Sequence, residues 1–332
     1  MKINRFGDTE LQVSELGFGC GAVGGLMVLG DHKEMMNAVE YAIDSGINYF
    51  DTARMYGDGL SEIHTGAILR ELDKTDLLIG TKVRIAGDEF EDIAKTISDQ
   101  IENSLQRLGI DTVDIVYTHN TIGAERNVSS GTLSVDDLNS IVEVFEKAAA
   151  SGKLRYWGFN GLGETDSIKE ALVQYSPSGI HTCYNMLNPT SGYQFTKTFP
   201  YQNYEELMKV ASGAGIGTVG IRILAGGALS GSLERHPIAQ QNVDPIATSA
   251  TFQEDVSRTS AFEFLLKEGF VDNLVEASVR FAISNDSLDT ALIGLSNFDQ
   301  LQQAVAYANK GALPQEALDN IRGIWAVSQL HE

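Results

Sequence analysis

The sequence predicts an α/β protein that closes into a (β/α)8 barrel with an N-terminal β-hairpin. Eight short apolar runs, rich in β-branched and aromatic residues, recur along the chain, and amphipathic segments with helical spacing separate them. No Pro- or Ser-rich linker divides the 332 residues. A barrel of this kind takes about 250 residues plus insertions. We therefore expect one barrel domain over residues 1–332, with long loops at the carboxyl-terminal mouth.

The elements follow in order from these patterns. The hairpin is expected from Lys2–Arg5 and Leu11–Val13, on either side of a Gly-Asp-Thr turn. The barrel strands are expected at Glu15–Cys20, Ile47–Thr52, Leu77–Val83, Thr112–His119, Leu154–Asn160, Gly179–Asn185, Gly217–Leu224 and Thr290–Leu295. The helices between them are expected at Lys33–Ser45, Ile63–Leu72, Phe90–Leu108, Val135–Ala150, Thr165–Tyr175, Tyr204–Ser212, Asn273–Ser284 and Asp299–Asn309.

The remaining residues form long connections and a C-terminal helix. The two longest loops are Thr121–Ser134 and Ser232–Arg258, and the last helix is expected near Pro314–Leu330. Loops of this length in a compact domain are usually functional, and in a barrel they lie at the mouth. We therefore expect both loops beside a binding site.

Charge and cysteine content exclude several classes of function. Acidic residues outnumber basic ones 45 to 24, giving a net charge of −21, which disfavours binding to nucleic acids and to anionic membranes. Two cysteines, Cys20 and Cys183, are too few for a disulfide framework or a zinc site, and no metal is expected. The N-terminus lacks a signal-peptide pattern, and the uncharged stretch Leu16–Gly30 is too short to span a bilayer. A cytoplasmic location is expected.

A Rossmann dehydrogenase is the alternative fold. Residues 19–24 read Gly-Cys-Gly-Ala-Val-Gly after a strand, and Asp51 ends the next strand. The helix should begin inside the glycine motif, but residues 25–30 still precede the helical pattern. Asp51 lies 32 residues after Gly19, instead of about 20. Both features favour the barrel.

Four polar residues lie at or just beyond the ends of apolar strands, namely Asp51, Tyr56, Lys82 and His119. Taken singly, Asp51 could cap a turn, and Tyr56 and His119 could be packing residues. In a barrel, however, successive strand ends face one mouth, so the four could converge. A lysine buried in an apolar strand needs a carboxylate partner, and Asp51 is the natural one.

Such a group makes a proton donor. The Lys82 cation would lower the pKa of Tyr56, which is ordinarily near 10, and Asp51 would hold Lys82 in place. His119 would orient a substrate oxygen or assist the proton transfer. The group offers no obvious nucleophile, so it suits protonation of an alkoxide that forms from a carbonyl while a cofactor supplies hydride.

The sequence resembles the aldo-keto reductase superfamily along nearly its whole length. The resemblance rests on residues 13–19, Phe-Asp-Thr-Ala-x-x-Tyr-Gly from residue 50, Thr-Lys at 81–82, Tyr-x-His at 117–119, and residues 184–187, 224–231 and 293–297. It implies a (β/α)8 barrel that binds NADP(H), less often NAD(H), at its mouth. It also implies a catalytic tetrad of Asp51, Tyr56, Lys82 and His119. In this tetrad Tyr56 is the general acid/base, acting on a small carbonyl or alcohol substrate. The oligomeric state stays open.

The resemblance also implies cofactor contacts. They are Gly19, Cys20, Gly21, Asp51, Asn160, His181, Ile221, Arg222, Leu224, Gly226, Ser230, Gly294, Ser296 and Gln300. The pyrophosphate is expected along residues 224–230, beneath the Ser232–Arg258 loop, with Arg222 or Arg258 as phosphate contacts. The family often has Ser-Asn where this chain has Asn160-Gly161, Gln at His181 and an aromatic at Ile221. NADP(H) is the preferred expectation, and NAD(H) stays open because the adenine segment lacks an arginine.

The substrate pocket is expected to be polar. Many family members have aromatic walls where this chain has Gly21-Ala22, Arg84 and Asn120. Small polar walls bury little apolar area, whereas Arg84 can form a fork to a carboxylate. We therefore expect a hydroxylated or acidic carbonyl compound, such as a sugar, in contact with Tyr56, Arg84, His119 and Asn120. The alternative is that Arg84 points to solvent and an apolar lid closes the pocket.

Two further classes stay open. A nicotinamide-binding, redox-sensing partner subunit, like the potassium-channel β subunits of this superfamily, would keep the cofactor with little turnover. A barrel glycosidase would need a second carboxylate at the fourth or fifth strand end, where His119 and Asn160 stand instead.

Overall fold

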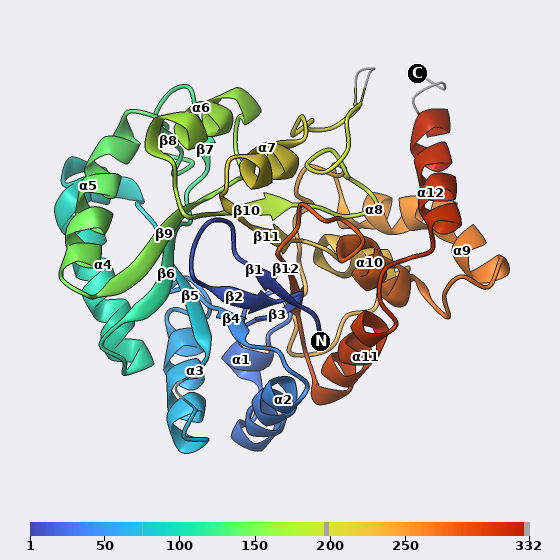
Figure 1. Ribbon diagram of the computed structural model, residues 1–332, viewed down its shortest axis with the longest axis horizontal. Helices are drawn as coiled ribbons and strands as arrows, with labels where there is room; N and C mark the ends of the chain where they lie inside the picture. Colours follow the sequence, from blue (N-terminus) through green and yellow to red (C-terminus); the bar gives the residue numbers. More distant parts are fainter. Residues whose placement is uncertain (75, 196–198, 329–332) are drawn as a thin grey trace.

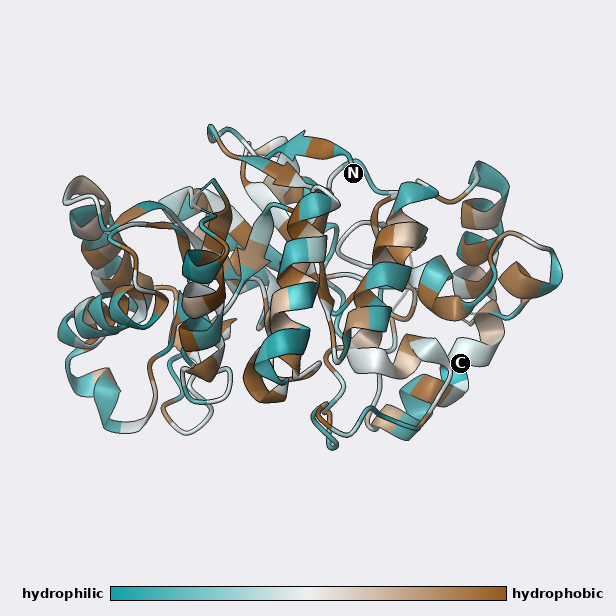
Figure 2. Ribbon diagram, turned by 90° about the horizontal axis from the view of Figure 1, so that it is seen from below, coloured by the Kyte–Doolittle hydropathy of each residue, from teal (hydrophilic) through white to brown (hydrophobic). Residues whose placement is uncertain are grey.

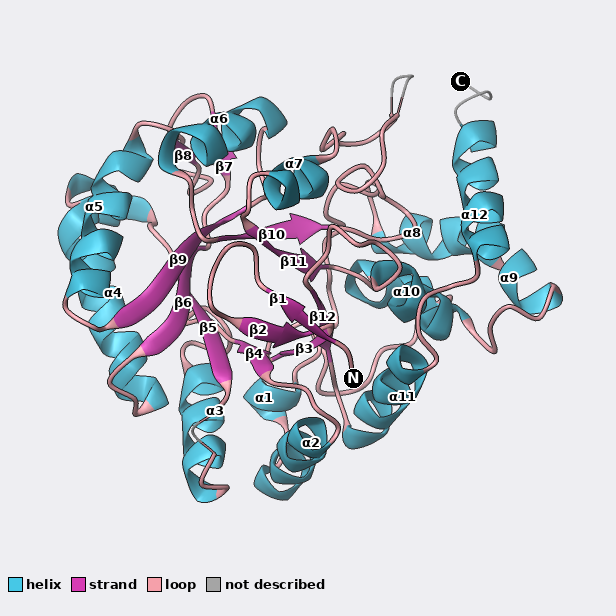
Figure 3. Cartoon of the chain, in the orientation of Figure 1, coloured by secondary structure: helices cyan, strands magenta, loops and turns pink. Residues whose placement is uncertain are grey.

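The computed structural model describes residues 1–74, 76–195 and 199–328. Eight parallel strands close into a barrel in the order β10-β11-β12-β3-β4-β5-β6-β9, and helices surround it (Figures 1 and 3). The expected (β/α)8 barrel is confirmed. The open sheet of the Rossmann alternative is wrong, because β12 pairs with β3 and leaves no edge.

Each barrel strand lies within the range that its apolar run predicted. The strands are β3 Leu16–Gly19, β4 Tyr49–Asp51, β5 Leu78–Val83, β6 Val113–Thr118, β9 Leu154–Asn160, β10 Gly179–Cys183, β11 Gly217–Ile221 and β12 Thr290–Gly294. The register places Gly19 beside Asp51 and Lys82 beside Tyr117. The polar residues at these strand ends therefore face the same mouth.

The N-terminal hairpin closes the other end of the barrel. It consists of β1 Ile3–Arg5 and β2 Gln12–Ser14, with Ile3 opposite Ser14. The fully buried ring of Phe6 packs so closely on Gly179 and Gly217 that a Cβ at either glycine would lie within 3 Å of it. The hairpin thus seals the amino-terminal end and leaves the carboxyl-terminal mouth for function.

The outer helices pack apolar faces on the barrel and turn polar faces outward (Figure 2). They are α2 His32–Asp44, α3 Leu60–Glu71, α4 Ile93–Leu108, α5 Asp137–Ala150, α6 Thr165–Tyr175, α7 Leu207–Gly213, α10 Leu274–Ala282 and α11 Phe298–Asn309. The helix expected from Phe90 begins at Ile93, because Asp92 caps it by accepting from the Lys95 N–H at 3.0 Å. None of the helices in the described residues is both long and apolar enough to cross a membrane.

Short elements inside the connections were not expected from the sequence. They are α1 Leu26–Leu29, the 3-10 turn η1 Gly87–Glu91, β7 Ile122–Gly123, β8 Leu133–Ser134, the turn η2 Ala225–Ser230, α8 Phe252–Arg258, the turn η3 Thr259–Phe262 and α9 Phe264–Lys267. Segments this short carry no readable periodicity. The last helix, α12, covers Gln315–Ser328, and residues 329–330 of the helix expected there lie outside the described residues.

Candidate active site

A buried ion pair lies at the centre of the barrel mouth. Lys82, at the end of β5, donates to Asp51 Oδ1 at the end of β4 and to the Thr52 carbonyl oxygen at 2.8 Å. The side chains of Lys82 and Asp51 are 2% and 4% exposed. Burial alone would lower the pKa of Lys82, but the Asp51 carboxylate outweighs it and raises that pKa, so Lys82 stays charged. The structure forms the pair that a buried lysine requires.

Tyr56 and His119 lie against this pair. The ammonium of Lys82 is 4.8 Å from the centroid of the Tyr56 ring. The rings of Tyr56 and His119 are 5.6 Å apart and nearly perpendicular, at 86°. Tyr56 lies in the turn between β4 and α3, and His119 follows β6. The structure therefore brings together all four residues that the sequence singled out.

Burial decides the protonation of the two rings. It raises the pKa of Tyr56, and the Lys82 cation opposes this without reversing it. The expected net lowering of the Tyr56 pKa is therefore wrong. Burial lowers the pKa of His119 to about 3, and the positive charge of Lys82 adds to the effect, so His119 is neutral at pH 7. Its buried Nδ1 has no hydrogen-bond partner among the described residues.

Asp51 has a second neighbour, His181 of β10. Its Nε2 lies 3.3 Å from Asp51 Oδ2, and its ring centroid is 4.2 Å from that of Tyr117. Burial lowers the pKa of His181, although Asp51 opposes the shift. Burial would raise the pKa of Asp51, but Lys82 and His181 outweigh it and hold that pKa at about 2. The sequence assigned His181 to the cofactor and did not indicate this contact with Asp51.

A cavity of about 500 Å³ opens from the tetrad along the barrel mouth. This volume lies in the range of small-molecule sites. The sequence-predicted residues that line it are Gly19, Gly21, Asp51, Tyr56, Lys82, His119, Asn160, His181, Ile221, Arg222, Leu224, Gly226, Ser230, Gly294, Ser296 and Gln300. Residues separated by up to 281 positions thus share one wall.

Three predicted site residues are not in the lining. The Cys20 side chain is fully buried in the core, and this burial raises its thiol pKa to about 12. The side-chain amide of Asn120 donates to the carbonyl oxygens of Ile85 at 2.8 Å and Gly131 at 2.6 Å, and its oxygen accepts from the Ile85 N–H at 2.9 Å. Arg84 also lies outside the lining. The amide of Asn120 is thus used to hold a loop, and neither Arg84 nor Asn120 belongs to the lining of this cavity.

The loop after β11 adds contacts that the sequence did not single out. Arg235 donates to the carbonyl oxygens of Gly226 at 2.7 Å, Gln240 at 2.6 Å and Val23 at 3.3 Å. These bonds fasten the loop to both the β11 turn and the segment after β3. The further lining residues are Val23, Gly24, Leu162, Ile223, Gly227, Ser232, Glu234, Arg235, His236, Ala239, Ile246, Val275, Leu292, Ile293, Leu295 and Gln303. Only the length of Ser232–Arg258 indicated that this loop would cover the site.

Two arginines in the cavity, Arg222 and Arg235, have no carboxylate partner in the part of the chain that the structure describes. Arg222 donates to the Asp244 carbonyl oxygen at 3.2 Å, and burial lowers its pKa. Burial also lowers the pKa of Arg235, and the positive charge of Arg222 adds to this shift. Within residues 1–74, 76–195 and 199–328, neither guanidinium forms an ion pair with an acidic side chain. Two neighbouring cations of this kind favour an anionic ligand. Arg258 differs, because it pairs with Asp255 at 3.5 Å.

A nicotinamide dinucleotide fits this set of residues. Its pyrophosphate would bring the negative charge that pairs with Arg222 and Arg235, and the backbone of Gly226 lies close to both guanidinium groups. Gly226 has a φ of +68°, and a Cβ there would lie 2.8 Å from the Arg222 guanidinium. His119 lines the same cavity as Tyr56, and its buried Nδ1 has no hydrogen-bond partner among the described residues. The donor set thus suits an anionic cofactor and a polar oxygen beside it.

Comparisons with known proteins agree with this architecture. The model of the "Aldo/keto reductase family" matches residues 15–326. L-galactose dehydrogenase from Arabidopsis thaliana is 24% identical, over 98% of this chain and 94% of the relative. Pyridoxal 4-dehydrogenase from Microbacterium luteolum is 25% identical, over 97% of each chain. The holo form of the aldo-keto reductase AKR11C1 from Bacillus halodurans superimposes with a TM-score of 0.72 at 24% identity, over 98% of this chain and 96% of that one.

Proposed function

The chain belongs to the aldo/keto reductase family, and from this premise we propose that it interconverts a small carbonyl compound and its alcohol. The observation that carries the proposal is the contact of Tyr56 with the Lys82 ammonium and the His119 ring on the wall of one cavity. A phenol that lies beside a cation and a neutral imidazole can give its proton to a carbonyl oxygen. A nicotinamide dinucleotide in this cavity supplies the hydride, or accepts it in the reverse direction.

Each residue of the site has a separate role in the proton transfer. As the carbonyl carbon gains hydride, the Tyr56 hydroxyl gives its proton to the carbonyl oxygen, so that a C–H and an O–H bond replace the C=O π bond. The Lys82 cation stabilises the phenolate that remains, and Asp51 keeps Lys82 charged. Neutral His119 orients the substrate oxygen. Solvent returns one proton to Tyr56, so each turnover consumes one hydride and one proton.

We infer a polar, hydroxylated substrate. Two relatives named above are an L-galactose dehydrogenase and a pyridoxal 4-dehydrogenase, and both names denote small hydroxylated compounds. Arg84 and Asn120 no longer support this inference, because neither lines the cavity. The second candidate is a nicotinamide-binding partner subunit. A probable voltage-gated potassium channel subunit beta from Arabidopsis thaliana is 25% identical over 91% of this chain.

Steady-state rates with NADH and NADPH test the proposal across sugars, other hydroxylated aldehydes and large aromatic aldehydes. Turnover should be highest with the hydroxylated set. Tyr56→Phe keeps the ring but removes the proton, so turnover should fall by about 100- to 10,000-fold while dinucleotide affinity stays within about twofold. Tyr41→Phe, on α2, is the matched control and should keep full turnover.

Three outcomes would count against this function. Near-normal turnover in Tyr56→Phe would reject Tyr56 as the acid. A strong preference for aromatic aldehydes would reject the polar substrate. Tight dinucleotide binding with no turnover across the panel would favour the partner-subunit candidate.

A further inference from the structure

One part of the cavity wall comes from the junction of β12 and α11. Ser296, Gln300 and Gln303 line it. The whole segment from Thr290 to Asn309 contains no lysine or arginine. The side chains that line this part thus carry hydroxyl or amide groups, and the segment's one carboxylate is Asp299, in the first turn of α11.

The first turn of α11 already has acceptors from the chain itself. Asn297 caps the helix by accepting from the Gln300 N–H at 2.9 Å, and the Gln300 side-chain oxygen accepts from the Ser296 N–H at 2.8 Å. The Phe298 N–H donates to Glu34 Oε1 of α2 at 3.2 Å. A carboxylate of this protein thus lies where a helix N-terminus would otherwise attract an anion.

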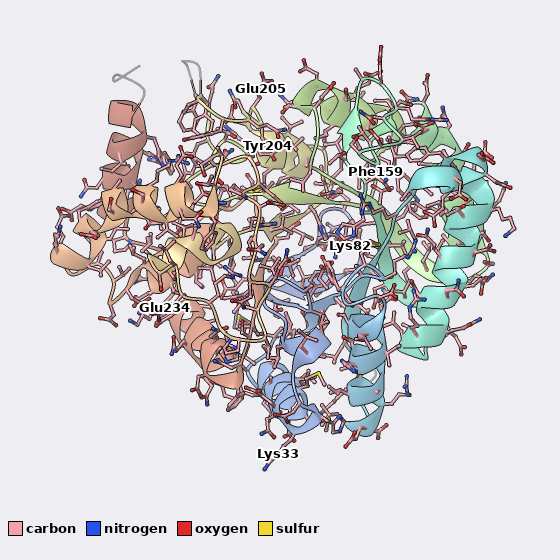
Figure 4. The ribbon with its side chains drawn as sticks, turned by 180° about the vertical axis from the view of Figure 1, so that it is seen from behind. Lys33, Lys82, Phe159, Tyr204, Glu205 and Glu234 are labelled. Atoms are coloured by element: carbon pink, nitrogen blue, oxygen red, sulfur yellow. The ribbon has the colours of Figure 1, made fainter. Side chains whose placement is uncertain are left out.

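A second carboxylate lines the cavity itself. Glu234, on the loop after β11, belongs to the lining and is exposed (Figure 4). Arg235 follows it, but its guanidinium donates to three backbone carbonyl oxygens. Arg222 follows β11 and donates to the Asp244 carbonyl oxygen. The start of α11 therefore carries the carboxylates of Glu34 and Asp299. Glu234 adds a further carboxylate to the cavity wall.

We propose that this part of the cavity selects NAD(H) over NADP(H), the reverse of the preference that the family resemblance implied. The proposal rests on the proposed function, because it assumes that a nicotinamide dinucleotide binds here with its adenosine toward α11. The two cofactors differ by one phosphate on the adenosine ribose, which carries roughly two negative charges near pH 7. Glu34 and Glu234 repel that group, and no cation of the β12–α11 segment compensates.

Dissociation constants of NADH and NADPH, measured on the whole protein by fluorescence titration, test the proposal. NADH should bind at least about tenfold more tightly. The discrimination is electrostatic, and Glu234 is exposed to solvent. Raising the salt concentration from about 0.01 to 1 M should therefore reduce the difference between the two dissociation constants.

Charge-neutral variants identify the source of the discrimination. Glu34→Gln keeps an oxygen that can accept from Phe298, and Glu234→Gln keeps the side-chain size. Each variant should lower the dissociation constant of NADPH by about threefold and leave that of NADH within about twofold of its wild-type value. Glu40→Gln, on the same helix as Glu34, is the matched control and should change neither constant.

The outcomes separate the two proposals. NADPH binding as tightly as NADH, or more tightly, would overturn the NAD(H) preference and leave the carbonyl–alcohol function standing. A preference for NADH that survives both substitutions and high salt would reject the role of Glu34 and Glu234. Binding of neither dinucleotide would overturn the proposed function itself.

Discussion

Removal of the buried cation beside Asp51 should cost both stability and activity. In Lys82→Met, the Asp51 carboxylate, 4% exposed in the native protein, loses its main charge partner. Lys82 and His181 hold the pKa of Asp51 at about 2, roughly two units below its ordinary value, which corresponds to about 2.5 kcal/mol. Leaving the charge buried and unpaired brings the expected loss in the free energy of unfolding to about 3–5 kcal/mol.

The pH dependence of this loss has a definite sign. In the wild type, the folded pKa of Asp51 is depressed, so the pair stabilises the fold above about pH 4 and the contribution is lost as pH falls toward 2. Without Lys82, burial raises the folded pKa above the unfolded one. Lys82→Met should therefore become more stable as pH falls from 7.5 to 5, whereas the pair gives the wild type no such change in that window.

Urea unfolding followed by circular dichroism at pH 7.5 and pH 5 measures both effects. The control is Lys153→Met, which breaks the half-exposed pair of Lys153 with Glu102 and should cost less than about 1 kcal/mol. Adding Asp51→Asn to Lys82→Met should recover much of the stability but none of the turnover. A Lys82→Met variant that costs no more than the control, or whose stability rises no more than that of the wild type between pH 7.5 and pH 5, would refute this role of the buried pair.

Three further predictions concern other parts of the chain. Burial raises the pKa of Asp289 to about 6, so the wild type should gain stability as pH falls from 6 toward 4, and Asp289→Asn should remove this gain in urea unfolding. Arg222→Leu should weaken NADH binding by about tenfold or more in fluorescence titrations, because the cavity loses a cation that faces the ligand; unchanged affinity would remove Arg222 from the site. Arg84→Ala should leave the specificity constants for polar aldehydes within about twofold, and a larger loss would restore Arg84 as a substrate contact.

The sequence alone determined the barrel and its centre. Apolar runs mark strands because a strand inside a barrel is buried on both faces, and each of the eight observed strands lies within its run. The need of a buried lysine for a carboxylate predicts the pair of Lys82 and Asp51 from the sequence. The parallel order of the strands then placed Tyr56 and His119 at the same mouth.

Only the tertiary structure decided how the side chains around this centre are used. Asn120 was expected to face substrate, but its amide satisfies the backbone of Ile85 and Gly131, a need that exists only once the loop has folded. The pKa of Tyr56 rises because burial of its hydroxyl outweighs the effect of the nearby Lys82 cation. The local sequence around Tyr56 does not reveal how deeply this hydroxyl is buried.

The partners of the cavity arginines and of α11 were likewise decided by contacts between distant segments. Arg235 reaches Val23, 212 positions away, and Glu34 reaches Phe298, 264 positions away. No local pattern encodes such pairs, because each depends on how loops and helices from opposite ends of the chain meet. The sequence therefore determines which chemistry the barrel mouth can hold, whereas the folded loops determine which charges a bound cofactor meets.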